Sequence, residues 1–126
     1  MIINHIDHIV LTTRDIKACT DFYTRVLGME LFIFGENRTA FLFGQQKINV
    51  HEYGNELEPK AHLPVPGSLD LCFIVAGTID VIIDQLQKTG IVIIEGPVRR
   101  TGACGAIMSC YIRDPDLNLI ELSCYI

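Results

Sequence analysis

The sequence predicts an α+β fold in which one βαβββ module occurs twice. The order strand, amphipathic helix, three strands can be followed in both halves of the 126-residue chain. The two halves also align without a gap over their first strand and helix. Asp70 lies 62 positions after His8, and Gly90 lies 62 positions after Gly28. We therefore expect a single domain, residues 1–126, made of paired modules.

The first module is expected over residues 1–54. The run from Ile6 to Thr12 is rich in β-forming residues and predicts a strand. A helix follows, because apolar residues then recur at steps of three and four along one helical face. These residues are Ile16, Cys19, Phe22, Tyr23, Val26 and Leu27. Gly28 is a typical helix end, and three strands are expected at 29–34, 39–43 and 47–53.

Residues 55–68 contain three prolines and read as a linker, so the second module is expected over 69–126. It begins with a predicted strand at 69–75. Thr78 is a plausible N-cap for a helix that ends at Gly90. The apolar face of that helix consists of Ile79, Ile82, Ile83 and Leu86.

Three strands complete the second module in this prediction. They are expected at 91–94, 106–113 and 117–124, with a glycine-containing loop at 96–105 and a turn at 114–116. In each module the helix covers one face of the sheet. The other faces are expected to form a cupped, barrel-like cavity lined by alternating strand residues.

Charge and cysteine content exclude several classes of protein. The net charge is -5, with Lys+Arg 10 against Asp+Glu 15, which argues against nucleic acid or anionic membrane surfaces as partners. No apolar run reaches the ~18 residues of a membrane helix or resembles a signal peptide. The five cysteines form no CxxC pair and predict reduced thiols in a cytoplasmic protein.

Motifs at both ends of the chain carry a family resemblance. The opening combines Asp7-His8-Ile9-Val10-Leu11 with Asp21-Phe22-Tyr23 and Leu27-Gly28-Met29. The ending is Asp114-Pro115-Asp116-Leu117-Asn118-Leu119-Ile120-Glu121-Leu122. Together they resemble the glyoxalase/bleomycin-resistance family of the vicinal-oxygen-chelate superfamily, over nearly the whole chain.

The resemblance implies paired βαβββ modules in a protein that is often a homodimer. It also implies a divalent metal ion, which chelates two neighbouring oxygens of a small-molecule substrate. Imidazole and carboxylate ligands suit Zn, Ni, Mn or Fe. The implied function is a metal-dependent lyase, isomerase or transferase of glyoxalase or fosfomycin-resistance type. The alternatives are an extradiol-type dioxygenase and a metal-free drug or metabolite binder of bleomycin-resistance type.

The family's ligand positions lie on the first and last strand of each module. They match His8, Asp70 and Glu121, and Glu121 is also a candidate general base. In the first module's last strand, the motif alignment selects Asn49, whereas His51 on the same strand face is the chemically better ligand.

Two positions depart from the family pattern. Asp70 stands where the family often has histidine, which favours the metal-free alternative and counts against a dioxygenase. Leu117 stands where the family usually has the glycine of the last turn. That position often requires a positive φ, which a branched side chain resists, so a different turn is expected.

Three further residues are candidates for the substrate cavity. Arg99 and Arg100 lie in the glycine-containing loop and could hold a carboxylate or phosphonate. On the following strand, Tyr111 and Cys110 face opposite sides, and we select Tyr111 as the cavity residue.

Overall fold

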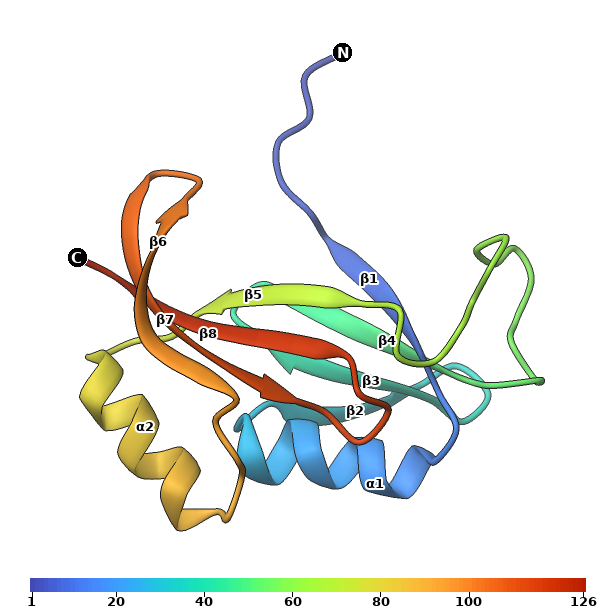
Figure 1. Ribbon diagram of the computed structural model, residues 1–126. Coiled ribbons are helices and arrows are strands. Elements are labelled where there is room, and N and C mark those ends of the chain that lie inside the picture. The colour runs from blue at the N-terminus through green and yellow to red at the C-terminus, as the bar shows by residue number, and fades with distance from the viewer. The chain divides into compact units, whose positions relative to one another are not determined.

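The computed structural model describes all 126 residues, and the chain divides into two compact units, Met1–Ser68 and Leu69–Ile126. Each unit contains a helix and a four-stranded mixed sheet, so the predicted βαβββ order is confirmed twice (Figure 1). The fold is α+β and glyoxalase-like, with one four-stranded sheet in each unit. None of the helices has the length and apolar character needed to cross a membrane.

The first unit follows the predicted order closely. Its elements are β1 (His8–Thr13), α1 (Ile16–Asp21), a π-helical turn η1 (Phe22–Val26), β2 (Glu30–Phe34), β3 (Arg38–Phe43) and β4 (Gln46–Glu52). The strand order is β1-β4-β3-β2. β1 is parallel to β4, and the other pairs are antiparallel.

The helix of the first unit packs on one face of its own sheet. The ring of Tyr23 stacks on that of Phe41 in β3, with centroids 5.2 Å apart, and both residues are fully buried. Asp15 caps the helix, since its Oδ1 accepts the Ala18 N–H at 3.0 Å. Gly28 then ends the helical segment with φ +72°, as the sequence predicts. The opposite face of this sheet, which we call the open face, carries Asn49 and its same-face neighbours.

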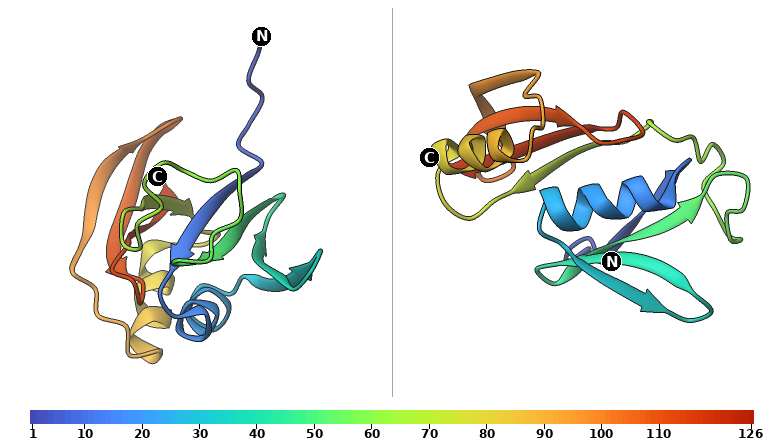
Figure 2. Two further views of the ribbon diagram at one scale, coloured as in Figure 1. Left: turned by 90° about the vertical axis from the view of Figure 1, so that its right-hand side faces the viewer. Right: turned by 90° about the horizontal axis from the view of Figure 1, so that it is seen from below.

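The second unit repeats this arrangement. Its elements are β5 (Asp70–Ile74), α2 (Ile79–Lys88), β6 (Glu95–Gly102), β7 (Gly105–Arg113) and β8 (Leu119–Tyr125). The strand order is β5-β8-β7-β6, with β5 parallel to β8. α2 packs against β7 and β8 through buried Ile82 and Leu86 (Figure 2). Thr78 occupies the N-cap position, although its side chain makes no capping hydrogen bond.

The sequence prediction is wrong for the second strand of the second unit, β6. Residues 91–94 are not a strand, and the predicted loop at 96–105 is β6 together with the start of its hairpin. The register shifts between Glu95 and Val98, which marks a bulge. Gly96 sits there with φ +109°, and a Cβ would lie 2.5 Å from the Ser109 carbonyl oxygen. This glycine serves close strand approach rather than a loop.

The registers of the two sheets make the internal repeat quantitative. Val10 of β1 pairs with Asn49 of β4, and Cys72 of β5 pairs with Glu121 of β8. The same offsets also match His8, paired with Lys47, to Asp70, paired with Leu119. Asn49 is therefore the structural counterpart of Glu121, and His51 is the counterpart of Ser123.

The turn before β8 also differs from expectation. Leu117 does adopt a positive φ, +69°, so the turn keeps the geometry that a glycine would favour. The Leu117 N–H donates to the Asp114 carbonyl at 2.9 Å, and the side chain is 67% exposed. Side-chain hydrogen bonds of Asp114 stabilise the turn. Its carboxylate accepts hydrogen bonds from the N–H groups of Asp116 and Asn118, each at 2.9 Å.

Leu117→Gly is expected to stabilise the protein. The left-handed conformation costs a branched residue about 1–2 kcal/mol, and glycine avoids this cost. Part of the gain is offset, because glycine also raises the conformational entropy of the unfolded chain. We expect the free energy of unfolding in urea to rise by about 0.5–1 kcal/mol. Leu63→Gly is the matched control, because Leu63 is 71% exposed and its φ is not positive. A loss of stability in Leu117→Gly equal to that of the control would contradict the account.

Candidate functional site

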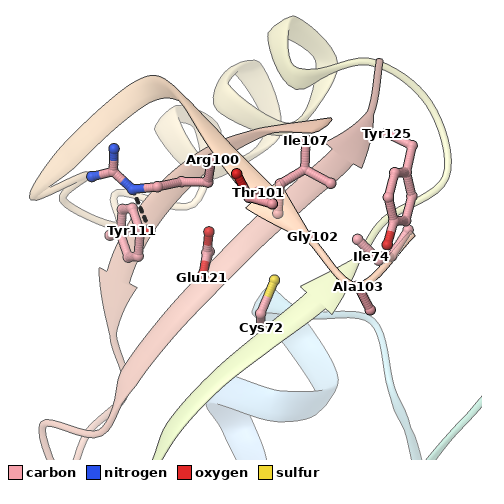
Figure 3. Close-up of a pocket in the computed structure, with 10 residues that line it drawn as sticks. All are labelled: Cys72, Ile74, Arg100, Thr101, Gly102, Ala103, Ile107, Tyr111, Glu121 and Tyr125. Atoms are coloured by element: carbon pink, nitrogen blue, oxygen red, sulfur yellow. Dashed lines mark hydrogen bonds between the residues drawn. The ribbon is translucent and has the colours of Figure 1, made fainter. Parts of the chain in front are cut away.

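The second unit contains a cavity of about 410 Å³ on the face of its sheet opposite α2 (Figure 3). Its lining comes from all four strands, because alternate residues of neighbouring strands project to the same side. Cys72, Arg100, Ile107, Tyr111, Glu121 and Tyr125 are among the lining residues. The cavity therefore combines a carboxylate, a guanidinium, a phenol and a thiol with apolar walls.

Glu121 lies at the centre of this cavity-lining face. It pairs with Cys72 of β5 on one side and with Tyr111 of β7 on the other. Its Oε1 atom is buried and has no hydrogen-bond partner. A buried acceptor without a partner costs about 1–3 kcal/mol, so such an atom calls for an explanation by function.

Tyr111 and Arg100 form a hydrogen-bonded pair beside Glu121. Arg100 Nε donates to the Tyr111 hydroxyl at 3.1 Å, and Nη2 donates to Glu95 Oε1 at 3.3 Å. The hydrogen bond to Tyr111 raises the pKa of Arg100, and burial raises the pKa of Tyr111. The Tyr111 hydroxyl thus accepts from the guanidinium and keeps its own proton, which it can donate to Glu121 or a ligand.

Cys72 is a cavity residue that the motif comparison did not single out. Its Sγ lies 3.4 Å from Ser123 Oγ, which in turn hydrogen-bonds Ser109 Oγ at 2.7 Å. Burial raises the pKa of the Cys72 thiol, with further contributions from nearby Glu121 and Asp70. The thiol is therefore protonated at neutral pH. Strand alternation from Asp70 would have placed both Cys72 and Ile74 on this face.

The remaining predicted residues of the second unit lie at or outside the cavity edge. Asp70 is exposed at the start of β5 and, by alternation, is on the same face as Cys72. Arg99 does not line the cavity and faces the other side from Arg100. Tyr125 also lines the cavity, although the sequence analysis did not select it, and it lies four residues after Glu121 on the same face of β8. Its hydroxyl accepts a hydrogen bond from the Cys104 N–H at 3.1 Å.

In the first unit, His8 is held by its neighbour. Its Nδ1 lies 2.7 Å from Asp7 Oδ2, and this hydrogen bond lowers the pKa of Asp7. A ring that donates from Nδ1 to this carboxylate has its Nε2 directed away from Asp7. A carboxylate that fixes a histidine in this way is the usual outer partner of a metal-binding imidazole.

Asn49 and His51 are both buried on the open face of β4, at 5% and 7% exposure. Asn49 Oδ1 has no hydrogen-bond partner. Burial, followed by the positive charge of Arg38, lowers the pKa of His51, so its imidazole is neutral. Asn49 Oδ1 and Glu121 Oε1 are the two buried side-chain oxygens without partners, and they occupy counterpart positions of the two modules.

Taken one by one, these residues carry atoms of the kinds that bind divalent metal ions. Glu121 and Asn49 offer oxygens that nothing else occupies, and His8 offers an oriented ring nitrogen. Mixed oxygen and imidazole ligands suit Zn, Ni, Mn and Fe. The structure brings no three His, Cys, Asp or Glu side chains together as a group that could hold a metal ion.

Comparison with known proteins adds the family context. Residues 5–122 match the Glyoxalase/Bleomycin resistance protein/Dioxygenase superfamily. The chain is 55% identical over 126 residues to "Virulence protein STM3117" of Salmonella typhimurium, covering 100% of this chain and 88% of that protein. It is 54% identical over 123 residues to "Glyoxalase domain-containing protein RDO1" of Mycosarcoma maydis, covering 98% of this chain and 69% of that protein.

Solved structures agree with the fold. The crystal structure of the Salmonella typhimurium virulence protein STM3117 superposes with a TM-score of 0.98 at 55% identity and covers 100% of both chains. The lactoylglutathione lyase of Agrobacterium tumefaciens superposes with a TM-score of 0.73 at 21% identity, covering 94% of this chain and 92% of that one. At that identity the second likeness supports the fold alone.

Proposed function

Because the chain belongs to the Glyoxalase/Bleomycin resistance protein/Dioxygenase superfamily, we propose that it is a metal-dependent enzyme acting on a small molecule with neighbouring oxygen atoms. A lyase, isomerase or transferase reaction is the proposed type. The observation that carries the proposal is the pair of unpartnered buried oxygens on Asn49 and Glu121. A fold that needed these side chains only for packing would gain stability by replacing them with apolar residues.

Glu121 is the proposed central ligand and catalytic carboxylate. The family resemblance adds His8 and Asp70 as further ligands, and either Asn49 or His51 from the first module. When bound, the metal ion would supply Lewis-acid polarisation of a substrate oxygen. His8 fits its role because Asp7 orients the ring, and Glu121 fits because its Oε1 is free to bind.

Tyr111 and Arg100 are the proposed substrate-binding residues of the second module. The Tyr111 hydroxyl keeps a proton that it can donate to a substrate oxygen beside Glu121. Arg100 holds this hydroxyl in place and keeps a positive charge near the cavity. Glu121 can accept a proton from substrate as a general base.

Two further features are proposed from the family and the composition. A homodimer would cover Leu31 and Ile33 of edge strand β2, which are 46% and 54% exposed. Light scattering of the purified protein tests this assembly. The five free cysteines fit a reducing cytoplasmic location.

Elemental analysis of protein purified without chelator tests the proposed function. We expect about one metal ion per chain in the wild type and in His62→Ala, whose histidine lies outside the proposed ligand set. His8→Ala and Glu121→Gln are each expected to lose most of that metal, because loss of a ligand weakens binding strongly.

The same series separates the alternative functions. Iron in the wild type together with oxygen uptake on catechols would assign an extradiol-type dioxygenase. Metal absent from every sample, with no binding of added Mn, Fe, Ni or Zn, would refute the metal-dependent enzyme and leave a small-molecule binding protein.

A further inference from the structure

A cluster of aromatic and cationic side chains lies on the open face of the first module. The rings of Phe32 and Phe34 in β2 stack with centroids 5.5 Å apart and an interplanar angle of 8°. The Arg38 guanidinium lies 4.7 Å from the Phe34 ring centroid, and Lys47 Nζ lies 4.2 Å from it. We call these four residues, with Asn49, the Phe34 cluster.

The strand registers place this cluster away from the helix. Phe34 pairs with Arg38, and Phe32 pairs with Ala40, which pairs in turn with Asn49. Phe41, the next residue of β3, points to the other face and stacks on Tyr23 of η1. The cluster is therefore a feature of the sheet's open face, and three strands, β2, β3 and β4, build it (Figure 1).

Neither cation of the cluster forms an ion pair with a carboxylate, although Lys47 contributes to lowering the pKa of Asp7. The ion pairs of the first unit join His8 to Asp7 and Lys60 to Glu56 and Glu58, and none includes Arg38 or Lys47. The chain as a whole carries a net charge of -5, so carboxylates are abundant elsewhere. Two positive charges held over one aromatic ring, neither of them in an ion pair, are complementary to an anion from solution.

Aromatic surface and an unsatisfied acceptor accompany these charges. Phe32 is 41% exposed although its ring is already stacked on Phe34. Asn49 is 5% exposed, and its Oδ1 has no partner. The open face thus offers charge, a flat apolar surface and one acceptor that no donor of the chain satisfies.

We infer that the Phe34 cluster binds a small planar organic anion. Its carboxylate lies against Arg38 and Lys47, its ring lies against Phe32 and Phe34, and a hydroxyl donates to Asn49 Oδ1. A simple inorganic anion would leave the aromatic surface in water, and a neutral ring would leave the two cations unpaired. The inference shares Asn49 with the proposed function, in which this residue is a candidate metal ligand, but the binding itself requires no metal ion and no residue of the second module.

Fluorescence titration of the full chain in the presence of EDTA tests the inference with three matched probes. 6-Hydroxy-2-naphthoate carries the ring, the charge and the hydroxyl. 2-Naphthoate lacks the hydroxyl, and 2-naphthol lacks the charge. We expect saturable 1:1 binding that weakens in the order hydroxynaphthoate, naphthoate, naphthol, with about a tenfold step for loss of the charge.

Variants assign each part of the probe to a residue. Lys47→Met and Arg38→Gln are each expected to weaken both naphthoates about tenfold and to leave naphthol unchanged. Asn49→Leu is expected to weaken the two probes that carry the hydroxyl, hydroxynaphthoate and naphthol, about fivefold and to leave 2-naphthoate unchanged. Lys17→Met, which removes an exposed positive charge from α1, is the matched control and should change nothing.

Three results would overturn the inference. These are the absence of saturable binding, equal binding of the naphthoates by wild type and Lys47→Met, and loss of binding in Arg100→Gln instead, which would move the anion to the second module. Circular dichroism melts of each variant establish that it is folded. Because the titration excludes metal, its failure is independent of any failure in the metal analysis of the proposed enzyme.

Discussion

Glu121→Leu is expected to yield a protein that is more stable than the wild type and has lost its metal and activity. In the wild type, Glu121 Oε1 is buried without a partner, between Cys72 and Tyr111. Leucine removes this unsatisfied acceptor and fills similar space. We expect the free energy of unfolding to rise by about 1–2 kcal/mol. Urea denaturation measures this change, and elemental analysis of the same samples measures the metal.

Ser123→Ala is the matched control for that experiment. Ser123 lies on the same face of β8, two residues from Glu121, but its hydroxyl is bonded to Ser109 at 2.7 Å and lies 3.4 Å from Cys72 Sγ. Removing this satisfied buried hydroxyl is expected to destabilise the protein by about 1–2 kcal/mol. If Glu121→Leu destabilises the protein to the same extent, Glu121 has a structural role and the orphaned oxygen does not mark function.

Asp114→Ala is expected to cause the largest loss of stability among the substitutions considered. Asp114 is 3% exposed, and its carboxylate accepts from the N–H groups of Asp116 and Asn118 and from Asn118 Nδ2, the last at 2.7 Å. Asn118 Oδ1 then accepts the Leu69 N–H at 2.9 Å, which ties the turn to the start of the second module. Hydrogen bonds to a charged group contribute about 1.5–3 kcal/mol each, and they are not additive.

We therefore expect Asp114→Ala to lower the free energy of unfolding by about 3–5 kcal/mol, measured by urea denaturation. Asp84→Ala is the control, because Asp84 pairs with Lys88 at the exposed surface of α2 at 2.9 Å, and such pairs contribute less than about 1 kcal/mol. Equal, small effects in both variants would show that the turn motif does not hold the module together. Metal content should be unchanged in folded Asp114→Asn.

The order of elements in each module was predictable because the apolar spacing and the internal repeat of the sequence correspond directly to burial and strand pairing in the structure. The helical faces around Tyr23 and Leu86 are buried as the spacing indicates. The offset between His8 and Asp70 is reproduced by strand pairing. Each of these features depends on periodic burial, which a single sequence displays directly.

The errors come from positions where glycine and leucine have roles that composition does not show. Gly96 marks a strand bulge because Ser109 approaches closely, and this contact comes from a strand that follows later in the chain. Leu117 takes a positive φ because the Asp114 network fixes the turn around it. The first effect is tertiary and the second comes from side-chain hydrogen bonds within the turn, so the preference of the single residue gives the wrong answer in both cases.

The candidate site was only partly visible in the sequence. Alternation along β8 predicts that Glu121 faces away from Ile120 and Leu122, and the structure places it in the cavity. Cys72 lines the same cavity and was missed because it belongs to no motif. The ending motif suggested Asn118 only as part of a family signature, whereas its side chain bridges Asp114 and Leu69. The unpartnered state of Asn49 Oδ1 and Glu121 Oε1 requires coordinates to recognise.

Anomalous diffraction from crystals soaked in Mn²⁺ is the most direct test of the central claim that Glu121 binds a catalytic metal. The account predicts a strong anomalous peak about 2.0–2.2 Å from a Glu121 carboxylate oxygen in the wild type, the usual range for first-row metal–oxygen bonds. The peak should be absent from Glu121→Leu crystals soaked in parallel. A wild-type map with no peak at Glu121, or one that persists in Glu121→Leu, would contradict the claim.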